Sequence, residues 1–413
     1  MYVTVERTSG STVNYNNVRL DFDFKEIYDI SYVDMNNTGY PSTILNGDNM
    51  SITFSDNSTY NGTATYSYNT NTLTVNSYTS TIPFGFTVTG TNTSNSYTNN
   101  VLTITNVTSD ITITKQAPSA QTLVQTILSM ASGYSDASTN AIDLGQGTGG
   151  CNIKLAYDGT TNKNLRYIGL NPCNYVSFQG ITWRIIGVFN NVEVDGKTEK
   201  ETLVKLISAE NYNSTQMAWN SSSVNNWVGS TLYNTLNTTF YTADLNSSSY
   251  VEKVKWPVGG TTSNNNSPSA YYTAERNTGS DSSSNTDHNP AGYVGLFYPS
   301  DYGLATDGGS DSGRTTCLST SYNQTAWRTG SNRVCSPNTW LYTETGSNYF
   351  WTITPISSAK NSVYRVGNAA IVATNIYSNQ QLSYVRPVIF LKGDVKVESG
   401  DGSSGTGAYT LTQ

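Results

Sequence analysis

The chain contains one histidine, so the residue types needed for nucleophilic catalysis are poorly represented. A serine or cysteine nucleophile requires a base within hydrogen-bonding distance, and that base is usually histidine. His288 lies in Asn285-Thr286-Asp287-His288-Asn289-Pro290, a loop-like segment in which a histidine is more often solvated than catalytic. The sequence therefore predicts a protein that is not an enzyme.

Paired carboxylates are the other constellation that could carry chemistry, because two of them can hydrolyse a glycoside. Acidic residues are sparse, and five of them lie in segments where the sequence alone cannot test an arrangement: Glu275, Asp301, Asp307, Asp311 and Glu344. A glycan-processing enzyme is therefore kept as the second alternative function.

One oxygen-rich segment, Asp307-Gly308-Gly309-Ser310-Asp311, offers ligands that suit calcium. It lacks the spacing of an EF-hand loop and its closing glutamate, so a turn is the better interpretation. We predict no cofactor and no metal site, with calcium kept only as an alternative at this segment.

The four cysteines fall into two pairs that are close in sequence. Cys151 and Cys173 form one pair, Cys317 and Cys335 the other, and neither contains a CxxC motif or a neighbouring histidine pair. This spacing predicts two disulfides and an oxidising, extracellular compartment. The alternative is four buried free thiols in a cytosolic protein.

The composition indicates a polar surface with few charges. Charged residues make up 12% of the chain, tyrosine occurs 30 times, and the formal net charge is −7. Such side chains offer hydrogen bonds and amphipathic contact area, as binding surfaces do. With lysine and arginine scattered, nucleic acid is an unsuitable partner. The sequence has no apolar run of 18 residues, so we predict no transmembrane segment.

Hydrophobic periodicity divides the chain into three parts. Residues 1–116 show alternating apolar residues at four places, which are Ile52 and Phe54, Leu73 and Val75, Leu102 and Ile104, and Ile111 and Ile113. This predicts an antiparallel β-sandwich of the Ig type. Residues 117–150 predict a short amphipathic helix followed by a Gly/Ser-rich linker.

Residues 151–413 predict a disulfide-stapled domain with mixed strands and helices. Val228, Leu232, Leu236 and Phe240 recur every fourth residue and indicate a helix with one buried face. The fold class predicted for the whole chain is mainly β with an α+β C-terminal part.

Several strings in residues 151–411 resemble an uncharacterised domain family of surface proteins from Gram-positive gut bacteria, some of them pilin-like. The strings are NLRYIGLNPCNYVSFQGITWRIIGV, WVGSTLYNTLN, NYFWTITP, SYVRPVIFLKGDV and SGDGSSGTGAYTL. The first part, with YDISYVDMNNTGYPSTI, LNGDNMSITF and NNVLTITNVTSDITIT, resembles the Ig-like repeats that accompany such domains.

The string Val385-Arg386-Pro387-Val388 is also similar to the closing strand of the C-type-lectin-like and formylglycine-generating-enzyme superfamily. This similarity implies a lectin-like fold in which residues 361–384 form an exposed binding surface, diversified by retroelements in some members. The candidate ligand-binding residues on it are Asn361, Tyr364, Asn368, Asn375, Tyr377, Asn379 and Tyr384. The alternative is that they are ordinary solvated strand and loop residues.

These observations favour an extracellular protein of the bacterial cell surface that recognises a glycan or protein of the host or of a bacterial surface. The first alternative is a structural, pilin-like filament subunit, in which the same faces would mediate self-association.

Overall fold

The computed structural model describes the second part of the chain almost completely and the first part mainly through its strands. Before residue 120 it describes residues 27–33, 42–45, 50–54, 64–67, 72–75, 86–90, 94–98, 101–105 and 107–115. After that it describes residues 121–412 except for 263–265, 278–282, 329–332, 342–348, 368–370 and 378–381. The chain forms two compact units, Met1–Ser119 and Ala120–Gln413.

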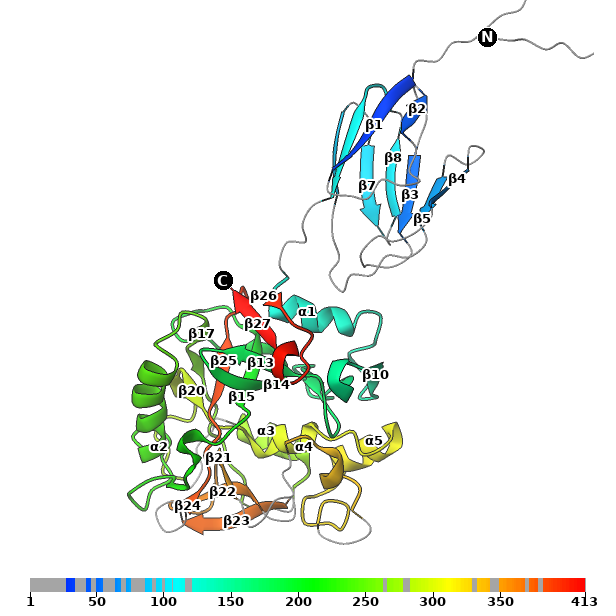
Figure 1. Ribbon diagram of the computed structural model, residues 1–413. Coiled ribbons are helices and arrows are strands. Elements are labelled where there is room, and N and C mark those ends of the chain that lie inside the picture. The colour runs from blue at the N-terminus through cyan, green and yellow to red at the C-terminus, as the bar shows by residue number, and fades with distance from the viewer. Residues whose placement is uncertain are drawn as a thin grey trace, which may run out of the picture. The chain divides into compact units, whose positions relative to one another are not determined.

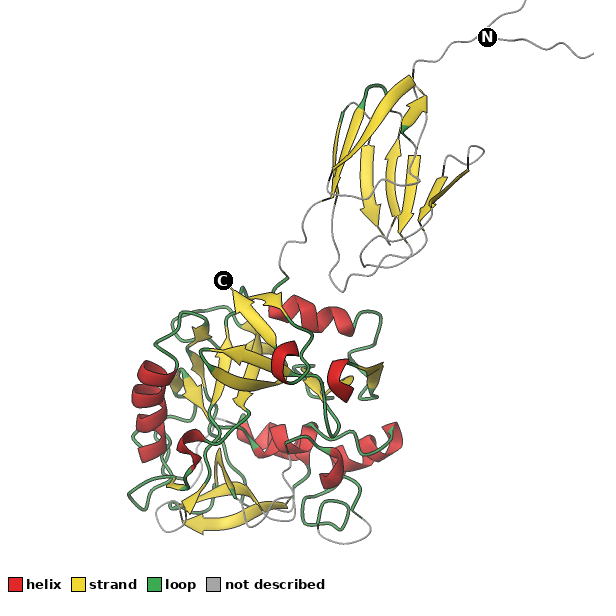
Figure 2. Cartoon of the chain, in the orientation of Figure 1, coloured by secondary structure: helices red, strands yellow, loops and turns green. Residues whose placement is uncertain are grey.

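The first unit contains two β-sheets (Figures 1 and 2). One has the order β2-β1-β9-β6, with β1 (Ile27–Val33), β2 (Thr43–Leu45), β6 (Phe86–Thr89) and β9 (Ile111–Lys115). The other has the order β4-β5-β3-β8-β7, with β3 (Met50–Phe54), β4 (Ala64–Ser67), β5 (Thr72–Val75), β7 (Ser94–Thr98) and β8 (Val101–Thr105). All four alternating segments of the sequence form strands. Each sheet also contains one parallel pair, β1 with β9 and β3 with β5, which the alternation did not predict.

The helix predicted within residues 117–150 and the segment after it belong to the second unit, which begins at Ala120. Helix α1 (Leu123–Met130) begins at a capping box formed by Thr122 and Gln125, and it buries Leu123 and Ile127 in the core of this unit. Strand β10 (Ile142–Gln146) pairs with β11 (Asn152–Tyr157). Backbone pairing and the burial of Ile142 therefore hold part of the segment that was predicted as a linker.

An eleven-stranded sheet forms the centre of the second unit. Its main path is β10-β11-β12-β14-β13-β27-β26, with β12 (Leu165–Tyr167), β13 (Tyr175–Phe178), β14 (Ile181–Val192), β26 (Lys396–Ser399) and β27 (Tyr409–Thr412). A branch leaves β14 through β15 (Glu201–Ser208) to β25 (Val388–Leu391), which also pairs with β17 (Val251–Glu252) and β20 (Val294–Gly295). The start and end of the unit are joined, because the backbone N–H of Leu123 donates to Val395.

Strand β15 is buried on both faces. Side chains alternate along a strand, so Leu203, Lys205 and Ile207 share one face while Val204 and Leu206 occupy the other. All five are at most 1% exposed. A charged residue therefore lies in the interior at position 205.

Helices and short strands surround the large sheet in Figure 1. The predicted helix is observed as α2 (Thr231–Asn234) continuing into the π-helix η3 (Thr235–Asp244), and Leu232, Leu236 and Phe240 are buried as expected. Val228 precedes the helix and is 38% exposed. Helices α3 (Pro268–Glu275), α4 (Pro299–Leu304) and α5 (Asp311–Ser319) pack on one another.

The remaining elements are short. A three-stranded sheet has the order β21-β22-β23, with β21 (Phe350–Pro355), β22 (Ser362–Gly367) and β23 (Ile371–Tyr377). Two-stranded pairs join β16 (Met217–Ala218) to β24 (Leu382–Ser383) and β18 (Val254–Lys255) to β19 (Ala291–Gly292). Single helical turns are η1 (Thr148–Gly150), η2 (Tyr212–Ser214), η4 (Ser336–Asn338) and η6 (Gly405–Gly407).

Both predicted disulfides are confirmed. Cys151 is bonded to Cys173 and Cys317 to Cys335, and all four side chains are buried. The mainly β character of the chain is also confirmed. Among the described residues, the structure has no helix of the length and hydrophobicity needed to span a membrane.

Candidate functional site

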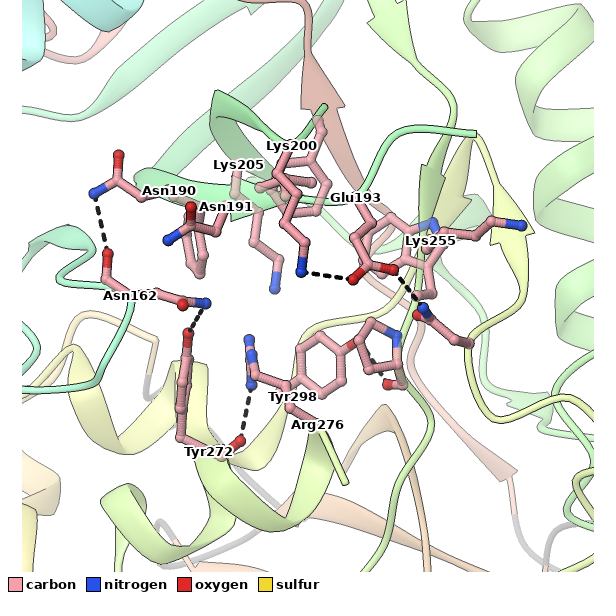
Figure 3. A pocket seen from close by; sticks show the side chains of 16 residues that line it. Asn162, Asn190, Asn191, Glu193, Lys200, Lys205, Lys255, Tyr272, Arg276 and Tyr298 are labelled. Carbon is pink, nitrogen blue, oxygen red and sulfur yellow. Dashed lines mark hydrogen bonds and ion pairs between the residues drawn. The ribbon is translucent and has the colours of Figure 1, made fainter. Parts of the chain in front are cut away.

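A pocket of about 250 Å³ opens beside β15 in the second unit (Figure 3). Five aromatic side chains contribute to its wall: Phe189, Trp256, Tyr272, Tyr298 and Phe390. Four cationic side chains and one carboxylate also line it: Lys200, Lys205, Lys255, Arg276 and Glu193. Five of its other lining residues are Asn162, Asn190, Asn191, Val192 and Asn289. The walls thus combine rings, amides and an excess of positive charge.

Lys205 forms a charged point in this otherwise aromatic wall. Its side chain is fully buried, and its Nζ lies 4.5 Å from the centroid of the Tyr298 ring and 5.1 Å from that of Phe189. Such contacts stabilise an ammonium group through the negative face of the ring. Burial nevertheless lowers the pKa of Lys205 to about 8, although the nearby carboxylate of Asp301 opposes this change.

Asp301 connects Lys205 to a second buried cation. Its Oδ2 lies 2.5 Å from Lys205 Nζ, and its Oδ1 accepts a hydrogen bond from Arg166 Nη1 at 2.8 Å. The backbone N–H of Tyr298 also donates to Oδ2, as expected for an acidic residue in the first turn of α4. Burial alone would raise the pKa of Asp301, but Lys205 and Arg166 outweigh it and hold this pKa well below its usual value.

Arg166 is shared between two carboxylates. Besides Asp301, it donates from Nε to Asp158 Oδ2 at 2.9 Å, and its guanidinium lies 4.6 Å from the centroid of the Phe189 ring. Its Nη2 is buried and has no hydrogen-bond partner among the described residues. One buried donor next to a wall of the pocket is therefore left unused.

Arg276, which follows the end of α3, lines another part of the pocket, and Glu275 is buried behind it. The guanidinium of Arg276 stacks on Tyr272, 3.5 Å from the ring centroid, and its Nη1 lies 3.3 Å from Glu275 Oε2. Glu275 is fully buried and accepts hydrogen bonds from the backbone and the hydroxyl group of Ser300. Burial raises the pKa of Glu275 to about 7, against the opposing influence of Arg276.

The rim of the pocket is held by exposed polar contacts. Lys200 Nζ lies 2.8 Å from Glu193 Oε1, and Asn289 donates to Glu193 Oε2 at 2.8 Å. On the other side, Asn162 donates from Nδ2 to the hydroxyl oxygen of Tyr272 at 3.0 Å. Figure 3 shows the side chains of Lys200, Lys205 and Arg276 pointing toward the same space.

Comparison with protein-family models, with curated proteins and with solved structures finds no match to this chain. Its function must therefore be inferred from its own geometry.

The structure does not bring the predicted tyrosine and asparagine residues together on one exposed face. Tyr364 is 1% exposed, and its hydroxyl donates to the backbone oxygen of Thr261 at 2.9 Å, so its ring is part of the core. The sequence suggested exposure at this position because tyrosine is common in binding surfaces, but the alternation of β22 directs this side chain inward. Tyr364 is therefore unsuited to contact a ligand.

Of the other six residues, the structure describes the side chains of two. Asn361 is half-buried, and Tyr384 is half-buried with its ring 6.0 Å from that of Phe350. Asn375 and Tyr377 lie in β23, for which the backbone alone is described. Asn368 and Asn379 lie outside the described residues. A ligand-binding role for these six stays a prediction.

The segment from Asp307 to Asp311 forms a turn that leads into α5. Asp307 pairs with Lys154 at 2.7 Å, and Asp311 Oδ1 accepts a hydrogen bond from the backbone N–H of Ala141. Gly308 has a φ of 60°, and a Cβ there would lie 2.3 Å from the backbone nitrogen of Arg314. Within the described parts of the chain, no group of three or more histidine, cysteine, aspartate or glutamate residues is placed to hold a metal ion.

Sequence reasoning missed the pocket, although one signal was present. Lys205 stands between Val204 and Leu206 in the apolar segment Leu203–Ile207, and Arg166 stands between Leu165 and Tyr167. In a chain with 12% charged residues, a cation inside an apolar strand requires a buried partner. The partner could not be identified, because Asp301 lies 96 residues from Lys205.

Proposed function

We propose that this chain is an extracellular, cell-surface recognition protein that binds a glycan in the pocket beside Lys205. The observation that carries this proposal is the combination of five aromatic rings with cationic and amide groups around one small opening. The rings, each at most 5% exposed, form the apolar base of the pocket, while amides and charged groups can bind the polar substituents of a sugar. The pocket volume is slightly below the range usual for drug-sized ligands, which fits a single sugar residue of a larger glycan.

The compartment supports the same proposal. Two buried disulfides are typical of proteins that fold outside the reducing cytosol. We also propose, from the resemblance of the sequence, that the first unit is an Ig-like sandwich and the second a C-type-lectin-like domain. The two sheets of the first unit and the mixed sheet with flanking helices in the second are compatible with this assignment.

The test is binding of the full chain to a glycan array, together with a variant that blocks the pocket. Val192→Trp adds a large ring at a half-buried lining position, and Val224→Trp adds the same ring at a 41% exposed position that does not line this pocket. We expect saturable binding that Val192→Trp abolishes and Val224→Trp preserves. Binding unchanged in Val192→Trp would exclude the pocket as the site, and failure of the folded chain to bind any glycan would refute glycan recognition.

A further inference from the structure

We propose that the sugar recognised by the Lys205 pocket is an acidic one, whose carboxylate binds between Arg276 and Lys200, with the buried Lys205 adding positive charge behind them. This inference rests on the proposed function and specifies the ligand class of the same site. Nothing in the composition suggested an anionic ligand, because the chain as a whole carries a net charge of −7. The positive charge is a local property of the pocket.

The arrangement of charges around the pocket is asymmetric. The side chains of Lys200 and Arg276 are 52% and 23% exposed, while Lys205 and the carboxylates of Asp301 and Glu275 are buried, and neither of these carboxylates lines the pocket. Glu193 is the one carboxylate among the lining residues, and Lys200 and Asn289 already occupy its two oxygens. A ligand in the pocket therefore meets the guanidinium of Arg276 before it meets the buried carboxylate of Glu275.

Arg276 is the best placed of these groups to bind a carboxylate. Both of its hydrogen bonds to described residues leave from Nη1, to Tyr272 O at 3.2 Å and to Glu275 Oε2 at 3.3 Å. Its Nε and Nη2 therefore have no protein acceptor in the described part of the chain. Stacking on Tyr272 fixes the plane of the guanidinium, so a bidentate bond to a carboxylate requires little further ordering of this side chain.

Lys205 provides a second positive charge, buried behind this site. Its ammonium is held by Asp301 and by aromatic rings, so the conformational entropy of the side chain is already lost. Asp301 is itself shared with Arg166, whose Nη2 has no partner among the described residues. The buried network behind the wall therefore contains one N–H donor group, Arg166 Nη2, to which no described acceptor is bonded.

The rest of the pocket fits a sugar ring better than a bare anion. Asn162, Asn190 and Asn191 line the pocket, and Asn191 is exposed at the rim, where its amide can bond a hydroxyl group. A sulfate or phosphate ion alone would leave these amides without a ligand hydroxyl group to bond. Inorganic sulfate is accordingly expected to bind much more weakly than an acidic sugar.

The test is calorimetric titration of the full chain with glucuronate, with N-acetylneuraminate and with the methyl ester of each, which keeps the ring and removes the charge. At least one acid is expected to bind at least tenfold more tightly than its ester. Arg276→Gln should weaken binding of that acid about tenfold to a hundredfold, the usual consequence of losing a charge-assisted pair of hydrogen bonds. Arg328→Gln removes an exposed arginine that does not line this pocket and should change nothing.

The outcomes separate this inference from the proposed function. Equal binding of acids and esters, blocked by Val192→Trp, would overturn the acidic ligand and leave glycan recognition intact. Inorganic sulfate binding as tightly as the acids would also overturn it, since the site would then select an anion alone. Absence of binding to any sugar or array glycan would refute both proposals. The Tm of Arg276→Gln, measured in parallel, establishes that the variant is folded.

Discussion

Burying the ion pair of Lys205 and Asp301 costs free energy, and a fold of this kind does not require such a pair for its stability. Removing a charged side chain from water costs several kcal/mol per ion even after relaxation, and a buried ion pair can often be replaced by apolar residues without loss of stability. Here four groups, Asp158, Arg166, Lys205 and Asp301, are all fully buried and joined by contacts of 2.5 to 2.9 Å. We infer that the network is kept because it fixes Lys205 at the pocket wall.

Glu275 gives a prediction at the scale of the single residue. Its pKa is about 7 in the folded state, raised by burial, so its favourable contribution is complete below the ordinary pKa of 4.5 and is lost as the pH rises through 7. Glu275→Gln keeps an acceptor for the backbone N–H of Ser300 and mimics the protonated acid. At pH 5 the variant should match the wild type in its free energy of unfolding, and at pH 8 it should be more stable by about 1–3 kcal/mol.

Chemical denaturation at the two pH values measures this difference. Glu398, exposed on β26, provides the control, because Glu398→Gln should have the same small effect at both. If Glu275→Gln were less stable than the wild type at pH 8, the ion pair with Arg276 would outweigh the burial of the charge.

At the scale of the element, the sequence predicted local patterns and missed what depends on distant partners. The alternation at Ile52 and Phe54 correctly predicted β3, and the apolar stripe from Leu232 to Phe240 correctly predicted a helix, because each pattern follows the local period of its element. The parallel pairing of β3 with β5 could not be predicted, because side chains alternate in the same way in parallel and in antiparallel strands. The sequence could not predict the pocket either, because β15, α3 and α4 are far apart in the sequence and come together only in the folded unit.

Helix α1 gives a prediction at this scale, because the sequence assigned it to a linker region. Ile127 is fully buried in the core of the second unit, so Ile127→Ala should remove about 2–5 kcal/mol from the free energy of unfolding of this unit. Ser129→Ala, at an exposed position of the same helix, should change it by less than about 0.5 kcal/mol. A helix that belonged to a linker would tolerate both substitutions equally in a denaturant titration.

At the scale of the whole molecule, the two units differ in how they are stabilised. All four cysteines lie in the second unit, where the disulfides join residues 22 and 18 positions apart. The backbone contacts between the start and the end of this unit close it on itself. The first unit contains no cysteine, so its stability depends on its two sheets.

This difference predicts two separate thermal transitions that respond differently to reduction. Each disulfide closes a loop of a length that contributes about 3 kcal/mol to stability, because it restricts the unfolded chain. A reducing agent should therefore lower the Tm of the second unit and leave that of the first unchanged, as differential scanning calorimetry can measure. The double variants Cys151→Ser/Cys173→Ser and Cys317→Ser/Cys335→Ser should each reproduce part of the decrease without reductant. Equal shifts of both transitions on reduction, or a single transition for the whole chain, would indicate that the two units are energetically coupled. The pocket would then be expected to lose its ligand whenever the first unit unfolds.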